Sequence, residues 1–261
     1  MNIEQVIDLR AFDGSCVPTI ASCPKTARSG AVLLHAYGRT KEQTLTLAFA
    51  LAELDVATVS IDLPGHGHNR ALPGLRMLDE VEAAIEWMRG QHQHVGCAGL
   101  GLGGRLALMS SADYIAALSP LVDACASAPG RVACDDFVRM DTAGPQADQS
   151  HAAAAGLGQL LKDLGPVAPI DRPCLLVHSD RDMPAHLESV DEFVALFRQC
   201  EVRRVASGAR PDVDDKSALI RHLPRWLNHQ ELLSNEEAVT VTSRWLAQMP
   251  GLLNMSKAAH K

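Results

Sequence analysis

Hydrophobic positions along the chain follow two different spacings. Apolar runs that fit buried strands are followed by segments whose apolar residues recur every three or four positions. The runs lie at 31–35, 56–62, 94–100, 114–120 and 173–179. The helical spacing is clearest for Leu47, Leu51 and Leu54, and again for Leu78, Val81, Ile85 and Met88. Strands and helices that alternate in this way predict an α/β fold with a mainly parallel central sheet and helices on both faces.

The pattern continues towards the C-terminus. The inward positions of the next expected helix are Val190, Phe193 and Phe197. After it, 201–207 is expected to form an edge strand. The last helix is expected to begin near Ser234, because Glu237 follows three residues later and the two fit a capping box.

One long segment, 121–170, departs from the pattern. It is rich in Ala, Gly and Asp and contains no predicted strand. We expect it to form a small cap insertion within a single domain that spans 1–261, and we find no internal repeat.

Composition limits the classes of partner. The 261 residues are 47% hydrophobic and 21% charged, as in an ordinary soluble domain, and the net charge of -7 disfavours nucleic acid or an anionic membrane. The N-terminus resembles no signal peptide, and no apolar run is long enough to span a bilayer. Seven scattered cysteines without a C-x-x-C motif indicate free thiols and therefore a cytoplasmic protein. The sequence does not indicate an oligomeric state.

The most informative stretch is the glycine-rich turn at Gly99–Gly104, which follows a predicted strand. Many hydrolytic enzymes carry a serine nucleophile at the third position of such a turn, in the pattern G-x-S-x-G, but here that position is Gly101. A phosphate loop is disfavoured because no G-K-[ST] follows, and no acidic residue is spaced for a dinucleotide. Cys97 belongs to the strand and Ser110 to the following helix, so neither is expected to replace the missing hydroxyl.

Five motifs, in this order, resemble those of the α/β-hydrolase family. They are "HAYG" at 35–38, "DLPGHG" at 62–67, "GLGLGG" at 99–104, "LLVHSDRDMP" at 175–184 and the segment 227–246. The resemblance extends from about residue 30 to about residue 248. It implies the α/β-hydrolase fold and chemistry on a small carbonyl or acyl substrate.

The resemblance also implies an oxyanion hole made by backbone N–H groups. The donors would be the N–H of Leu102, after the turn, and the N–H of Tyr37, in the loop after the first predicted strand. Ala36 stands in this loop where the family has its first glycine. His35 is expected to be structural, with its ring hydrogen-bonded to loop backbone.

The acid and base follow from the same resemblance. Asp182 fits the acid best, four residues after His178 at the end of a strand, with Asp180 as the alternative. His229 fits the base, and His222 is a second option. A shorter gap, closer to the family's usual spacing, would instead place Arg210 at the histidine position.

Gly101 leaves three interpretations open. In the first, His229 and Asp182 perform non-covalent acid–base chemistry, such as a lyase, cyclase or proton-transfer reaction, beside the oxyanion hole. In the second, the chain is a serine ester or thioester hydrolase whose nucleophile has been replaced. In the third, it is a catalytically silent binding or scaffold protein. We favour the first, and none of the three calls for a cofactor; the H-x-H pairs at 66–68 and 92–94 lack the further ligands that a metal site needs.

Overall fold

The computed structural model describes most of the chain. The described residues are 3–5, 9–122, 157–180, 194, 199–206 and 232–259. Most of the expected cap, at 123–156, lies outside them, as do the inward positions expected for the helix around Phe193.

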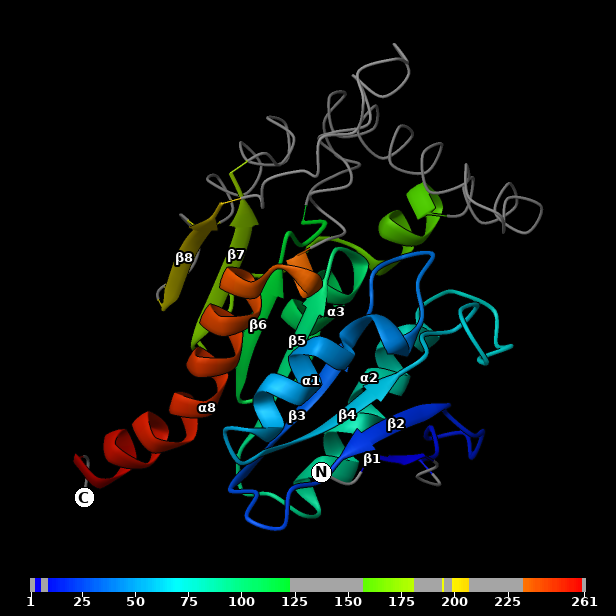
Figure 1. The fold of residues 1–261 in the computed structure, drawn as a ribbon. Helices are drawn as coiled ribbons and strands as arrows, with labels where there is room; N and C mark the ends of the chain where they lie inside the picture. Colours follow the sequence, from blue (N-terminus) through cyan, green and yellow to red (C-terminus); the bar gives the residue numbers. More distant parts are fainter. Residues whose placement is uncertain are drawn as a thin grey trace, which may run out of the picture.

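The described strands form a single sheet. They are β1 (Ile3–Gln5), β2 (Thr19–Ser22), β3 (Ser29–Leu34), β4 (Val56–Ile61), β5 (Val95–Leu100), β6 (Tyr114–Leu118), β7 (Cys174–Ser179) and β8 (Cys200–Val205). Their order across the sheet is β1-β2-β4-β3-β5-β6-β7-β8 (Figure 1). The β1–β2 and β2–β4 pairs are antiparallel, and the other neighbours are parallel. The expected mainly parallel sheet is confirmed.

Helices cover both faces of this sheet, also as expected. They are α1 (Leu45–Ala52), α2 (Arg76–Arg89), α3 (Leu102–Met109) and α8 (Glu236–Ala259), with short 3-10 turns η1 (Lys41–Thr44) and η2 (Leu232–Ser234). Residues 157–164 are helical as well. Successive residues of a strand face opposite sides, so Ala31 and Leu33 join the core under α1 and α8, while Val32 and Leu34 join the core under α2 and α3 (Figure 1).

The central strands are buried along their whole length. Every residue of β3, β4, β5, β6 and β7 is buried, which explains why they appear in the sequence as apolar runs rather than as alternating patterns. The expected edge strand is confirmed as β8, which pairs with β7 and is largely exposed or half-buried.

Two features differ from the expectations. The sequence pattern did not predict β1 and β2, because β2 is only four residues long and includes Thr19 and Ser22. The last helix begins near Ser234 as expected, at Glu236, but the expected capping box is wrong. Asn235, not Ser234, caps α8, since its side-chain oxygen accepts a hydrogen bond of 2.9 Å from the N–H of Ala238. The carboxylate of Glu237 instead accepts the N–H of Ala206 at 3.0 Å.

The longest described helix, α8, contains Pro250. Within the described residues, we find no helix with the length and apolar character needed to cross a bilayer.

Candidate functional site

Three loops meet at the carboxyl edge of the sheet, because β3 lies between β4 and β5. They follow Leu34, Ile61 and Leu100, the last residues of these strands. In open α/β sheets this is the edge at which ligands bind. The residues expected at the site from the motifs "HAYG", "DLPGHG" and "GLGLGG" therefore lie in adjacent loops.

A single residue, Gly101, links β5 to α3. Its φ of 57° and ψ of −110° lie in a region that side chains strongly disfavour. The N–H of Gly101 donates to the carbonyl of Leu118 at 3.0 Å, and its carbonyl accepts the N–H groups of Arg105 and Leu121 at 3.0 and 3.1 Å. These bonds attach the turn to the end of β6 and to the first turn of α3.

The flanking glycines allow α3 to pack closely on its surroundings. A Cβ atom on Gly99 would lie 2.3 Å from the carbonyl carbon of Gly103. A Cβ atom on Gly103 would lie 2.6 Å from the carbonyl oxygens of both Leu34 and His35. Any side chain at either position would therefore collide with backbone, which explains the repeated glycines in physical terms.

The N-terminus of α3 points its backbone donors at the site edge. The hydrogen bond from the Arg105 N–H to Gly101 is the first within the helix. The N–H groups of Leu102, Gly103 and Gly104 come earlier in the helix and have no acceptor on a preceding turn. The first of these belongs to Leu102, the donor expected from the sequence.

The loop after β3 contains the other expected residues, Ala36 and Tyr37, and both are buried. The N–H of Ala36 donates to the side-chain oxygen of Gln43 at 2.9 Å, so it holds the loop together. The ring of Tyr37 contacts the ring of His66 edge-on, with centroids 5.1 Å apart. This contact joins the loop after β3 to the loop after β4.

His35 makes the structural contacts expected of it. Its Nδ1 donates to the carbonyl of Ala36 at 2.7 Å, and its Nε2 accepts the N–H of Leu63 at 3.0 Å. Burial, with a smaller effect of His66, lowers the pKa of His35 to about 3. The ring is therefore neutral at ordinary pH and connects the two loops as a fixed tautomer.

A buried ion pair lies beside this histidine. The Nζ of Lys41 contacts Oδ2 of Asp62 at 2.7 Å, and the N–H groups of Lys41 and His68 each donate to the same carboxylate at 2.9 Å. Burial alone would raise the pKa of Asp62, but these donors together lower it below its usual value. Gly67 passes close to this carboxylate, where a Cβ atom would lie 2.4 Å from its atoms.

Sequence reasoning missed Arg105, although it is the only charged residue of α3. It is buried, and its guanidinium donates to the carbonyls of Leu121 at 2.5 Å and Val122 at 2.8 Å. It also donates to the carbonyl of Gly165. Arg105 thus links the helix after Gly101 to both sides of the segment 123–156.

A second residue missed from the sequence is Ser119, which follows β6. Its φ of 37° is unusual for a residue with a side chain, and it is fully buried. Its chain neighbour Leu118 accepts a hydrogen bond from Gly101. No local sequence signal marks a serine with this backbone conformation.

The expected acid and base fall mainly outside the described residues. Asp180 is described: it is exposed, directly follows β7, and donates its N–H to the carbonyl of Val205 at 2.9 Å. Asp182, His229, His222 and Arg210 lie outside the described part of the chain. Within the described part, no group of three or more His, Cys, Asp or Glu residues is arranged to hold a metal ion.

Comparison with known proteins identifies the fold. No family model and no curated protein matches the chain. Among solved structures, it is similar to an esterase from Pyrococcus furiosus, with 14% identity over 87% of this chain and 91% of that chain and a TM-score of 0.59. A dienelactone hydrolase from Anabaena variabilis is 13% identical over 95% of this chain and 97% of its own, with a TM-score of 0.58.

A third solved structure, the alpha/beta hydrolase GrgF from Penicillium, is 14% identical over 88% of this chain and 99% of its own, with a TM-score of 0.57. Together with the strand order and the helices on both faces, these likenesses show that the chain has the α/β-hydrolase fold.

Proposed function

We propose that this chain is an enzyme that acts on a small carbonyl or acyl substrate without a serine nucleophile. In this proposal His229 is the acid–base group, Asp182 orients it, and the N–H groups of Tyr37 and Leu102 form the oxyanion hole. The observation that supports the proposal is the one-residue turn between β5 and α3, where Gly101 has a φ of 57° and a ψ of −110° and bears no side chain.

The roles follow from simple electrostatics. A substrate oxygen that becomes negative gains most from donors that are already in place, and the α3 N-terminus supplies such donors together with its helix dipole. His229 then moves the proton, and Asp182 stabilises the imidazolium that forms. Ala36 contributes indirectly, because its hydrogen bond to Gln43 supports the loop that presents Tyr37.

Glycine at position 101 leaves room where a serine hydroxyl would otherwise stand. That space suits a water molecule or the substrate carbonyl itself, and no covalent intermediate forms. Deprotonation next to a carbonyl, giving an enolate held by the two N–H groups, is the simplest reaction that such a site supports. It requires no cofactor.

A serine hydrolase whose nucleophile has been replaced is the second candidate. The observation in its favour is that Gly99 and Gly103 keep α3 packed tightly against β5 and the loop after β3, although position 101 bears no side chain. The similarity to an esterase and to a dienelactone hydrolase agrees with it at the level of fold. A silent binding protein is the third candidate.

Two assays on four proteins separate the candidates. The proteins are the unmodified chain, Gly101→Ser, His229→Ala and the double variant. The first assay follows deuterium exchange next to the carbonyl of a small 1,3-dicarbonyl compound by NMR. The second follows burst hydrolysis of short p-nitrophenyl esters. We expect the unmodified chain to accelerate the exchange, and His229→Ala to reduce it by about 10²–10⁴-fold.

Other outcomes assign the chain differently. An ester burst that appears with Gly101→Ser and is lost in the double variant, without exchange by the unmodified chain, favours the replaced hydrolase. No exchange and no burst in any protein contradicts both enzyme candidates and leaves the silent binder.

A further inference from the structure

Two cysteines lie side by side at the amino ends of the strands, whereas the loops described above follow the carboxyl ends. Cys174 is the first residue of β7 and Cys200 the first residue of β8, and they are register partners in this parallel pair. The N–H of Cys174 donates to the carbonyl of Gln199 at 2.9 Å, which fixes the alignment of the two strands at this point.

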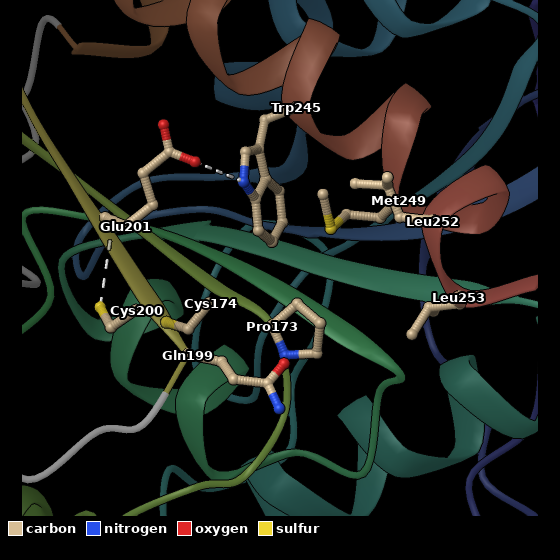
Figure 2. A pocket seen from close by; sticks show the side chains of 9 residues that line it. All are labelled: Pro173, Cys174, Gln199, Cys200, Glu201, Trp245, Met249, Leu252 and Leu253. Carbon is tan, nitrogen blue, oxygen red and sulfur yellow. Dashed lines mark hydrogen bonds between the residues drawn. The ribbon is translucent and has the colours of Figure 1, made fainter. Parts of the chain in front are cut away.

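The backbone spacing suits a covalent link. Register partners on neighbouring strands lie about 4.7–4.9 Å apart, within the range of about 4.4–6.8 Å between Cα atoms that a disulfide spans. The two side chains share a face, since both pack in the core cluster under α2 and α3. Figure 2 shows the two cysteines next to each other, and the thiol of Cys200 is also hydrogen-bonded to the carbonyl of Glu201, with a sulfur–oxygen distance of 3.9 Å.

A cavity that both cysteines help to line lies next to the pair. Its volume is about 440 Å³, and it lies between α8 and the starts of β7 and β8 (Figure 2). Cys174 is buried and Cys200 half-buried. The lining is apolar on the α8 side, at Trp245 and Met249, and includes a carboxylate at Glu201, which accepts the indole N–H of Trp245 at 3.1 Å.

The thiols differ in acidity. The hydrogen bond with Cys174 lowers the pKa of Cys200, and the same bond, together with burial, raises the pKa of Cys174. Cys200 is therefore the thiol that ionises first, and it is also the more exposed of the two. These are the properties of an attacking thiol with a resolving partner.

We propose that Cys174 and Cys200 are a redox-active pair that closes to a disulfide when a small hydroperoxide reaches the half-buried Cys200. The Cys200 thiolate attacks the peroxide, the O–O bond breaks, and an alcohol leaves while Cys200 becomes a sulfenic acid. The sulfur of Cys174 then attacks the sulfur of Cys200, and the S–O bond breaks. The hydroxyl of the Cys200 sulfenic acid takes up the proton of the Cys174 thiol and leaves as water. Two thiols lose two electrons in total, and the peroxide is reduced to alcohol and water.

The other described cysteines lack this arrangement. Cys97 is fully buried, and burial raises the pKa of its thiol to about 12. Cys16 and Cys23 are exposed and lie in the N-terminal region, away from the β7–β8 pair. Cys16 therefore serves as a matched control for unspecific oxidation.

The test is a peptide map of the full chain after treatment with hydrogen peroxide and blocking of the remaining thiols. Trypsin yields peptides 163–181 and 199–203, each with a single cysteine. We expect these two peptides to appear linked, and to separate on reduction with dithiothreitol. Cys200→Ser should abolish the link, and Cys16→Ser should preserve it.

A second variant tests the order of the steps. Cys174→Ser should halt Cys200 at the sulfenic acid, which dimedone traps. The proposal is wrong if peroxide takes Cys200 of the unmodified chain to sulfinic or sulfonic acid without the linked peptide. It is equally wrong if Cys200 links to other cysteines as readily as to Cys174.

Discussion

At the scale of single residues, the backbone conformation at position 101 explains why glycine is favoured there. A φ of 57° with a ψ of −110° is available to glycine without steric conflict, whereas a side chain there costs about 1–3 kcal/mol. Glycine at 101 therefore relieves strain that a nucleophile would impose. The neighbouring Gly99 and Gly103 are constrained for a different reason, because backbone atoms occupy the space of any Cβ.

Backbone strain at position 101 and steric collision at position 103 predict different losses of stability on substitution. Gly101→Ala should lower the free energy of unfolding by about 1–3 kcal/mol, since only local strain is introduced. Gly103→Ala should lower it by about 3 kcal/mol or more, because neither the Leu34 nor the His35 carbonyl can move without displacing β3 or its loop. Urea unfolding measures both.

Gly158→Ala is the matched control. Gly158 lies in the helical segment 157–164, and a Cβ atom there meets nothing within 4 Å. This substitution should leave stability unchanged or raise it by up to about 1 kcal/mol. Equal losses for Gly103→Ala and Gly158→Ala would rule out the close packing of α3 on the β3 loop.

Single residues also show where sequence reasoning ends. The contacts of His35 with loop backbone were predicted, because they are local or follow from the motif. The partner of Asp62 was not predicted, since Lys41 is 21 residues away and no local pattern identifies it. Arg105 is a similar case, because its acceptors become neighbours only through the fold.

At the scale of elements, α8 offers the clearest correction. The sequence contains two adjacent candidates for its cap, Ser234 and Asn235, and spacing to Glu237 favoured the first. The structure selects Asn235, because Glu237 is engaged with the Ala206 N–H after β8. A tertiary contact thus decided between two caps that are equivalent in local chemistry.

A cap exchange tests this assignment. Asn235→Ala should lower the free energy of unfolding by about 1 kcal/mol, because it leaves the Ala238 N–H without its acceptor. Ser234→Ala is the control and should change stability by much less. Thermal or urea unfolding of both variants provides the comparison, and a larger loss for Ser234→Ala would restore the capping box.

The same scale shows which elements the sequence reveals. Buried parallel strands are continuous apolar runs, so β3 to β7 could be located without a structure. β1 and β2 are short antiparallel additions whose residues carry little hydrophobic signal. They are stable because they extend an existing sheet edge at β4, which is a property of the assembled sheet and not of their own sequence.

At the scale of the whole molecule, stability should depend on pH through His35. Its folded pKa of about 3 lies below the ordinary value of 6.5, so the unfolded chain binds a proton that the folded chain does not. Stability from this group is therefore complete above pH 6.5 and is lost as the pH falls towards 3. The slope approaches about 1.4 kcal/mol per pH unit.

Urea unfolding at pH 7.5 and 5.5 isolates this effect. Lowering the pH from 7.5 to 5.5 should reduce the free energy of unfolding of the unmodified chain by about 1.4 kcal/mol through His35 alone. The reduction in His35→Asn should be smaller by that amount. His68→Asn controls for removing an exposed histidine. An identical pH dependence in the unmodified chain and His35→Asn would mean that His35 is not held neutral.

The strand order has a consequence for how the molecule opens in solution. β3 has a neighbour on each side and a helical layer on each face, so its amides exchange with solvent only when the whole domain unfolds. β8 pairs with β7 alone among the described strands, and its backbone is accessible to brief local opening. The loops around Gly101 are therefore attached to the slowest-exchanging part of the protein, while Cys200 lies on an edge strand whose local opening brings it into contact with solvent oxidants.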